Sequence, residues 1–184
     1  IPMSRGMGFS GAVRVGGVIA AEMQSQGSSW SRSTSRALHI GTELEGHPDN
    51  VAPSVYGGVV IVSDDLVVPV PMALDPVFVM WVPEFSTSTN ESRSKIGSSI
   101  ALSDAVFNMA RTAMLVTAFQ TGDVALLNEA TRDRIHQDIR FDASPACRDA
   151  LQTGLEAGAW CGWLSGSGPT VALMCDSSDA ERVA

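Results

Sequence analysis

The sequence predicts a protein of mixed helices and strands in two parts, because it contains both helical and strand patterns and a cluster of prolines that separates its two parts. Small and apolar residues recur at helical spacing over 12–23 and 103–119. Apolar runs typical of strands lie at 59–62, 66–70 and 77–83. We expect the first two runs to form a hairpin. The third is apolar almost throughout, so we expect a buried strand there.

Three prolines follow one another closely at the end of the hairpin and just after it, namely Pro69, Pro71 and Pro76. Proline fixes its own backbone and removes a hydrogen-bond donor, so it interrupts regular structure. We therefore expect a domain boundary near residues 71–76, with one domain at 1–72 and the other at 73–184.

Local signals give further expectations. The polar stretch 24–36 is expected to be a loop, and 37–44 a short helix. Ser103 and Asp104 are expected to cap the long helix of the second part, whose methionines should fill the core. Gly122 is expected to end that helix.

Composition places the chain among ordinary globular proteins. Its 184 residues are 45% hydrophobic and 17% charged, enough for a sizeable core. The formal net charge of −8 argues against nucleic acid or an anionic membrane as the main partner. No apolar run approaches the roughly 18–20 residues that a membrane-spanning helix needs.

Three cysteines, Cys147, Cys161 and Cys175, form no C-x-x-C pair. An odd number with this spacing indicates buried or neutral thiols in a reducing compartment, and not a disulfide framework. A cytoplasmic location is therefore expected.

A glycine-rich stretch, 2–11, precedes the first helical pattern. Such a turn offers backbone N–H groups and the positive end of the helix dipole, and glycine lets a phosphate approach the backbone closely. Gly6, Gly8 and Gly11 spell G-x-G-x-x-G, which is a weak motif alone, and the lysine of a Walker loop is missing. The stretch predicts a phosphate site, with a plain helix-capping loop as the alternative.

The densest polar run of the chain extends from Glu43 to Asn50 and holds three carboxylates, one imidazole and one carboxamide in eight residues. It cannot be core, and a glycine pair and a strand pattern follow it, so it predicts a site between a helix and a sheet. Carboxylate oxygens suit Mg²⁺, which keeps several waters. A zinc site is the alternative, but the spacing matches no zinc signature.

Two further polar segments contain arginines, which bind carboxylates and phosphates through paired hydrogen bonds. One is the hydroxyl-rich stretch 84–93, where a surface pair between Glu91 and Arg93 is the alternative. The other is 133–140, which is too polar to be buried whole. Near the C-terminus, residues 158–175 are expected to form strand, glycine turn and strand.

The run Glu-Gly-His-Pro-Asp-Asn-Val-Ala-Pro at 45–53, followed by Tyr-Gly-Gly, resembles the substrate and metal segment of homoserine kinases, in the GHMP small-molecule kinase superfamily. Four other segments agree in order along the chain. They are the glycine loop at 5–12, Thr89-x3-Arg93, Asp-Arg-x-His-x3-Arg at 133–140, and Gly-Ser-Gly-Pro-Thr at 166–170.

The resemblance implies that the glycine loop binds ATP, with Ser10 near Mg²⁺ and the phosphates. Phe9 stands where the family has its first serine, and Gly11 where it has an alanine. One glutamate of the polar run would bind Mg²⁺, with Glu43 favoured over Glu45. The implied ATP-binding residues are Pro2, Arg5, Gly6, Met7, Gly8, Phe9, Ser10 and Gly11. A supporting glycine loop would be formed by Ser165, Gly166, Ser167 and Gly168.

The same resemblance implies an amino-acid pocket and a set of residues near the reacting groups. Two arginines would meet the substrate carboxylate, and Asp49 could pair with its ammonium group. The implied substrate-binding residues are His47, Asp49, Asn50, Thr89, Arg93 and Arg140. The implied catalytic residues are Glu43, Asp49 and Asn50, and His136 would orient its loop.

The resemblance implies the two-domain α+β GHMP kinase fold, with an N-terminal part like ribosomal protein S5 domain 2 and a ferredoxin-like C-terminal domain. Residues 1–72 would be the C-terminal part of the ATP-binding domain, and a preceding β-rich segment would be absent. Exposed sheet edges would then favour association, as in a homodimer.

The implied activity is Mg-ATP-dependent phosphorylation of the L-homoserine hydroxyl to O-phospho-L-homoserine in threonine biosynthesis. Two alternatives stay open. One is a GHMP kinase that acts on another alcohol, although two carboxylate-type arginines argue against a sugar or mevalonate. The other is a catalytically silent binding protein of the same fold, which the atypical Phe9 keeps open.

Overall fold

The computed structural model describes residues 1–184 except 27–29, 65, 87–95 and 98. The chain divides into two compact units. The first contains Ile1 and residues 8–71, and the second contains residues 2–7 and 72–184. The domain limits 1–72 and 73–184 stay a prediction. Thr89 and Arg93 lie outside the described residues.

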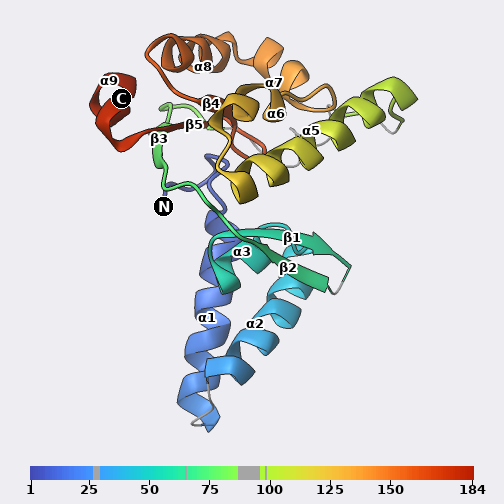
Figure 1. The fold of residues 1–184 in the computed structure, drawn as a ribbon. Helices are drawn as coiled ribbons and strands as arrows, with labels where there is room; N and C mark the ends of the chain where they lie inside the picture. Colours follow the sequence, from blue (N-terminus) through green and yellow to red (C-terminus); the bar gives the residue numbers. More distant parts are fainter. Residues whose placement is uncertain (27–29, 65, 87–95, 98) are drawn as a thin grey trace. The chain divides into compact units, whose positions relative to one another are not determined.

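The described part of the first unit begins with helices and ends in a hairpin (Figure 1). Its elements are α1 (Phe9–Gln26), α2 (Trp30–Glu45), α3 (Val51–Tyr56), β1 (Val59–Ser63) and β2 (Leu66–Val70). A small core joins the helices through Val15, Ala37 and Val51, which are at most 4% exposed. An added Cβ on Gly41 would lie 2.8 Å from Val51 Cγ1, so glycine allows α2 to approach α3.

The predicted hairpin is confirmed. Strands β1 and β2 are antiparallel, with Val59 opposite Val70 and Ser63 opposite Leu66. Neither strand shows strict alternation of burial, because several apolar side chains on both strands are exposed, including Ile61 at 43% and Leu66 at 63%. The hairpin therefore covers little of its own apolar surface within the first unit.

The loop expected at 24–36 is wrong at both ends, because α1 runs to Gln26 and α2 begins at Trp30. Serine-rich segments are weak helix formers in isolation, but tertiary contacts override this preference. Arg36 Nε lies 3.1 Å from Glu22 Oε1 across the two helices. Thr34 is only 9% exposed, so this part of α2 is held by packing against α1.

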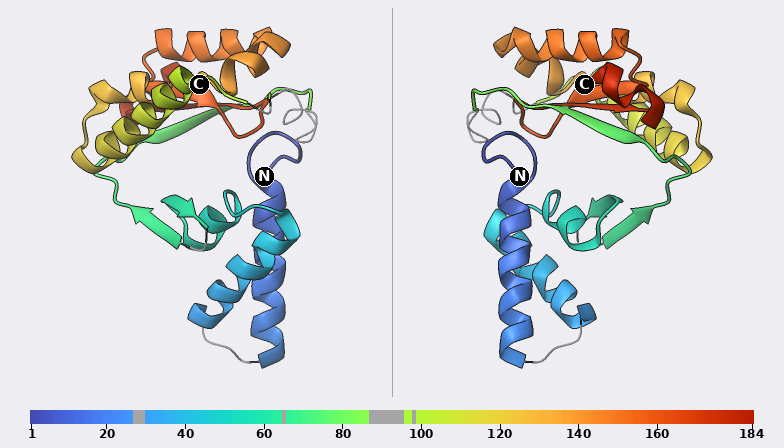
Figure 2. Two further views of the ribbon diagram at one scale, coloured as in Figure 1. Left: turned by 90° about the vertical axis from the view of Figure 1, so that its right-hand side faces the viewer. Right: turned by 90° about the vertical axis from the view of Figure 1, so that its left-hand side faces the viewer.

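The second unit combines a three-stranded sheet with helices. Its strands are β3 (Val77–Trp81), β4 (Cys161–Leu164) and β5 (Val171–Cys175), paired antiparallel in the order β3-β5-β4. Its longer helices are α5 (Leu102–Thr121), α7 (Gln137–Ala143) and α8 (Pro145–Glu156). Short pieces complete it: η1 (Val124–Leu126), α6 (Leu127–Ala130), η2 (Ser177–Asp179) and α9 (Ala180–Val183). Helix α8 lies along one face of the sheet and packs on β4 and β5 (Figure 2).

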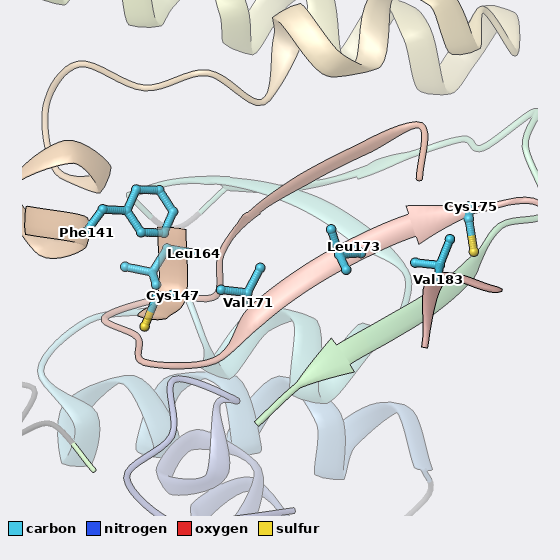
Figure 3. Close-up of a cluster of buried hydrophobic side chains, with 7 residues drawn as sticks. All are labelled: Phe141, Cys147, Leu164, Val171, Leu173, Cys175 and Val183. Atoms are coloured by element: carbon cyan, nitrogen blue, oxygen red, sulfur yellow. The ribbon is translucent and has the colours of Figure 1, made fainter. Parts of the chain in front are cut away.

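The core of the second unit is built around β5, whose five residues are all buried. Val171, Leu173 and Cys175 point to the same side of this strand, toward residues from α7, α8, α9 and β4 (Figure 3). The predicted buried thiols are confirmed for Cys147, Cys161 and Cys175. Burial raises the pKa of all three, that of Cys161 to about 12, so they stay protonated and unreactive at neutral pH.

Three predictions about the second unit are wrong, namely the burial of the strand at 77–83, the cap of the long helix by Ser103 and Asp104, and the filling of the core by its methionines. Among the described strands, β3 lies at the edge of the sheet, and its Phe78 is 49% exposed. Helix α5 begins after Ala101 and has no side-chain cap, and its Met109 is 63% exposed. Gly122 does end this helix, with a φ of 75°. Among the described residues, none of the helices combines the length and apolarity needed to cross a membrane.

Gly154 of α8 tests how closely this helix packs on β5, and Gly17 of α1 is a matched control. At Gly154, an added Cβ would lie 2.7 Å from Leu173 Cδ2, whose residue is only 2% exposed and cannot swing away. We expect Gly154→Ala to lower the free energy of unfolding by about 1–3 kcal/mol. At Gly17 of α1 nothing lies within 4 Å, so Gly17→Ala should raise it by about 0.5–1 kcal/mol. Urea unfolding measures both, and equal effects would contradict the packing described.

Candidate functional site

The N-terminus of α1 supplies backbone donors in the first unit. The first hydrogen bond of this helix runs from Ala12 N–H to Gly8 O at 3.0 Å. The helix ladder therefore does not use the N–H groups of Phe9, Ser10 and Gly11, which point along the axis at its positive end. Gly8 has a φ of +67°, a conformation that favours glycine. This end of an 18-residue helix is suited to bind phosphate.

Gly11 brings the start of α1 against the polar run. An added Cβ at this position would lie 3.1 Å from both Cβ and O of Asn50. That is closer than most real Cβ atoms approach a backbone, so the absence of a side chain allows this contact. Gly11, which stands where the family has alanine, therefore lets Asn50 lie beside the predicted phosphate loop.

Ser10 meets Glu45, and not Glu43. Ser10 Oγ donates a hydrogen bond of 2.8 Å to Glu45 Oε2. Arg14, one helical turn after Ser10, forms a salt bridge to the same oxygen. The Glu45 side chain is only 10% exposed, so these two partners satisfy a carboxylate that has left water. Glu43 is 66% exposed and lies 3.4 Å from His39 Nε2.

The substrate residues predicted after Glu45 form a tight turn. The Nδ1 atom of His47 contacts Asp49 Oδ1. The same oxygen accepts the backbone N–H of Asn50 at 2.8 Å, and Ser54 Oγ donates to Asn50 O at 2.7 Å. The structure thus brings His47, Asp49 and Asn50 together at the start of α3.

In the second unit, the first part of the phosphate loop lies against the supporting glycine loop. Ser165 Oγ donates to Gly6 O at 2.8 Å, and Thr170 N–H donates to Arg5 O at 3.4 Å. Gly6 has a φ of +73°, and a Cβ there would collide with Ser165 O and lie 2.8 Å from Gly168 O. Only glycine fits this contact. The predicted role of the loop as a support is consistent with this geometry and stays a prediction.

Arg140 extends from α7 to the same glycine loop. Its Nη1 donates to Gly166 O at 3.1 Å and to His136 Nδ1 at 2.8 Å. The structure therefore places one of the two predicted carboxylate-binding arginines beside the support of the phosphate loop. Its predicted companions Thr89 and Arg93 are outside the described ranges, and Ser167 is half-buried in the glycine loop.

The donor set of the first unit fits Mg²⁺. Ser10 and Glu45 supply one hydroxyl and one carboxylate oxygen, and Mg²⁺ commonly takes one or two carboxylates together with water and substrate phosphates. In the part of the chain that the structure describes, no three His, Cys, Asp or Glu side chains gather as a metal cluster. The N-terminus of α1 fits the phosphates of a nucleotide, because the helix ladder leaves its first N–H groups available as donors.

Comparison with known families identifies both ends of the chain. The family model described as GHMP kinases N terminal domain matches residues 1–58, and the one described as GHMP kinases C terminal matches residues 115–184. The chain belongs to the GHMP kinase family. The resemblance found from five short segments is thereby confirmed at the level of the family.

This GHMP kinase chain is similar to several homoserine kinases. It is 41% identical over 187 residues to a homoserine kinase from Desulfitobacterium hafniense and 39% identical over 185 residues to one from Thermus thermophilus. Both alignments cover 100% of the chain. The chain spans 62% of the length of each relative.

A solved structure confirms the predicted α+β fold of GHMP kinases. A homoserine kinase from Cytophaga hutchinsonii superposes with a TM-score of 0.89 at 29% identity. The superposition covers 100% of this chain and 60% of the other. The fold class is therefore established for the described chain, including the helices and strands that carry the site.

Two contributors to the site were missed in the sequence. Arg14 follows Ser10 by four residues, and this spacing places both on one face of a helix, so the periodicity alone could have indicated it. Asn108 of α5 donates from Nδ2 to Asp133 Oδ2 and accepts the N–H of Arg134 at 3.0 Å. No local signal indicates this contact, because the two segments are about 25 residues apart and meet only through the fold.

The contact of Gly6 with the glycine loop can be tested with a matched glycine. Gly6→Ala is expected to detach residues 2–7 from the glycine loop and to speed amide hydrogen exchange at residues 165–170. Gly58 also has a positive φ, +60°, but has nothing within 4 Å. Gly58→Ala should therefore cost only the backbone strain, about 1–2 kcal/mol, without faster exchange in the loop. Unchanged exchange at 165–170 in Gly6→Ala would contradict the contact.

Proposed function

We propose that this chain forms most of a homoserine kinase, which transfers the γ-phosphoryl group of ATP to the hydroxyl of L-homoserine and yields O-phospho-L-homoserine for threonine biosynthesis. The observation that carries the proposal is the match of the whole chain to proteins of that name at up to 41% identity. The geometry supports it independently, because a helix N-terminus, a hydroxyl and a buried carboxylate lie together in the first unit.

We assign the phosphate and metal roles as follows. The N–H groups at the start of α1 bind ATP phosphates, and Ser10 and Glu45 hold Mg²⁺. Glu45 is preferred to Glu43, the residue favoured from the sequence, because it accepts the hydrogen bond of Ser10 and is nearly buried. When bound, Mg²⁺ neutralises charge on the phosphate oxygens.

We assign the acceptor amino acid to the polar turn and to Arg140. Asp49 is 63% exposed and carries a negative charge that suits the ammonium group of homoserine. Asn50 supplies an amide that can bind the hydroxyl or the carboxylate. Arg140 binds the carboxylate, because a guanidinium matches its two oxygens. Thr89 and Arg93 keep their predicted roles by resemblance alone.

The proposed reaction needs little covalent chemistry from the protein. The homoserine hydroxyl oxygen forms a bond to the γ-phosphorus while the bond to the β,γ-bridging oxygen breaks, and ADP leaves. Phosphoryl transfer of this kind is catalysed mainly by positioning and by stabilisation of charge. We therefore assign no general base. Asp49 holds the ammonium group and Asn50 positions the hydroxyl, and the proton can pass directly to the transferred phosphoryl group.

Three finer features belong to this proposal. Mg²⁺ is the proposed metal on the basis of the oxygen donors at Ser10 and Glu45. A cytoplasmic location is proposed because the cysteines are free and buried. A homodimer is proposed because several sheet-edge and hairpin side chains are exposed, including Phe78 and Leu66. Sedimentation of the gene-encoded protein tests the last of these.

The experiment that tests the function is release of ADP from Mg-ATP by the protein as its gene encodes it. The acceptors to compare are L-homoserine, L-serine, L-threonine, mevalonate and galactose. Turnover with homoserine alone supports the proposal. Turnover with another alcohol alone replaces the substrate assignment. No turnover with any acceptor overturns the kinase assignment in favour of a silent binding protein.

The two glutamates form a matched pair for the metal assignment. Glu45→Gln keeps the size of the side chain and an acceptor for Ser10 but removes the charge that Mg²⁺ needs. We expect it to lower kcat by about 10²-fold or more, in the range found when a charge-stabilising group is lost. Glu43→Gln should change kcat by less than about twofold, because an exposed ion pair contributes little.

The measurement for this pair is kcat at several Mg²⁺ concentrations, with circular dichroism as a check that both variants fold. A large loss in Glu43→Gln with normal activity in Glu45→Gln would reverse the assignment to the residue favoured from the sequence.

A further inference from the structure

The hydrogen bond between Arg140 and His136 fixes the protonation state of the histidine. Arg140 Nη1 lies 2.8 Å from His136 Nδ1. A guanidinium carries only donors and stays charged in proteins, so Nδ1 must be the acceptor. The single proton of a neutral imidazole therefore lies on Nε2.

The other ring nitrogen faces a carboxylate that is itself held in place. His136 Nε2 lies 3.5 Å from Asp133 Oδ2, and the Asp133 side chain is 10% exposed. Asp133 Oδ1 accepts three backbone N–H groups at 2.6–2.9 Å, from Ile135, His136 and Gln137. Its Oδ2 accepts the amide of Asn108. Asp133 thus has one orientation available, and it favours the Nε2–H form of His136.

We infer that His136 is a positioning residue for Arg140: its neutral Nε2–H form, oriented by Asp133, accepts a hydrogen bond from the guanidinium and holds it against Gly166 O for binding the substrate carboxylate. The inference rests on the proposed function in one respect, namely that Arg140 binds this carboxylate. It adds a residue that acts through Arg140 and does not touch the substrate.

Protonation of His136 would remove this support. A proton on Nδ1 would place an N–H against the N–H of Arg140 and two positive charges side by side. Burial lowers the pKa of His136 below its ordinary value of 6.5; the negative charge of Asp133 opposes this effect and the positive charge of Arg140 adds to it. Burial alone would raise the pKa of Asp133, but hydrogen bonds to the backbone, the charge of His136 and the amide of Asn108 outweigh it and lower that pKa.

The sign of the pH dependence follows from these groups. Among the residues that the structure describes, the charged groups that act on His136 are Asp133 and Arg140, whereas Asn108 of α5 and the carbonyl of Gly166 are uncharged. The neutral form of His136 prevails above its lowered pKa, so the support is complete at neutral pH and is lost as the pH falls through that pKa. The KM for homoserine should rise on the acid side.

The test compares variants of the gene-encoded protein in their KM for homoserine, KM for ATP and kcat. His136→Ala removes the acceptor and should raise the homoserine KM about tenfold, as expected for a lost hydrogen bond to a charged group. Its kcat and its KM for ATP should change by less than about threefold. His136→Asn places an amide oxygen near the former Nδ1 and should restore most of the affinity for homoserine.

The pH profile separates positioning from a structural role. Between about pH 8 and pH 5, a range that extends below the ordinary histidine pKa, the parent should show the acid rise in homoserine KM, and His136→Asn should not, because an amide does not titrate. His39 is a matched control, since it is 76% exposed and paired with Glu43 on the surface of the first unit. His39→Asn should keep both the KM and the acid rise of the parent.

The outcomes distinguish the inference from the proposed function. Arg140→Met should raise the homoserine KM at least as much as His136→Ala. If the parent phosphorylates homoserine but His136→Ala keeps its KM, or His136→Asn keeps the acid rise, the inference is wrong and the function stands. If Arg140→Met keeps its KM, the carboxylate assignment is wrong and the inference with it. If the parent does not use homoserine at all, the proposed function has failed first.

Discussion

The close approach of Gly6 to the loop at 165–170 is the constraint on which the site in the second unit depends. The backbone of the loop approaches Gly6 in the space that a Cβ would fill, and Ser165 Oγ donates to Gly6 O at 2.8 Å. Arg140 bonds to Gly166 O of the same loop. The loop at 165–170 therefore contacts both Gly6, in the first part of the phosphate loop, and Arg140, which is suited to a carboxylate. Displacement of this loop would disturb both contacts.

In the first unit, the corresponding constraint is the near-complete burial of a charge. A buried carboxylate is costly unless it has partners. Ser10 and Arg14 supply these partners at the same oxygen of Glu45. A metal ion at this carboxylate would meet the positive charge of Arg14, so the arginine would have to move or to share the oxygen. The same pairing explains why Glu45 can be held ready on the face of α2 that lies toward α1, whereas Glu43 lies in solvent.

The sequence predicted the parts of the fold that depend on local signals. The hairpin, the end of α5 at Gly122 and the strand, glycine turn and strand near the C-terminus all follow from turn residues and apolar runs. The sequence could not show whether Glu43 or Glu45 meets Ser10. Residues two apart on a helix face nearly opposite sides, and only the packing of α1 on α2 shows which side lies toward Ser10. Apolar content likewise could not reveal that β3 is an edge strand, since order in a sheet is set by distant pairing.

The chain is negatively charged overall, but it places donors for anionic groups at particular positions. A formal net charge of −8 disfavours an anionic nucleotide at long range. Screening limits that effect to about 8 Å at physiological ionic strength, so nearby donors decide binding. Each unit contributes donors for one kind of anionic group by itself: the N-terminus of α1, suited to phosphate, in the first, and Arg140, suited to a carboxylate and bonded to His136, in the second. The proposed neutral state of His136 matters for Arg140. A second cation beside Arg140 would repel the guanidinium, whereas a neutral acceptor orients it and leaves its charge for the substrate.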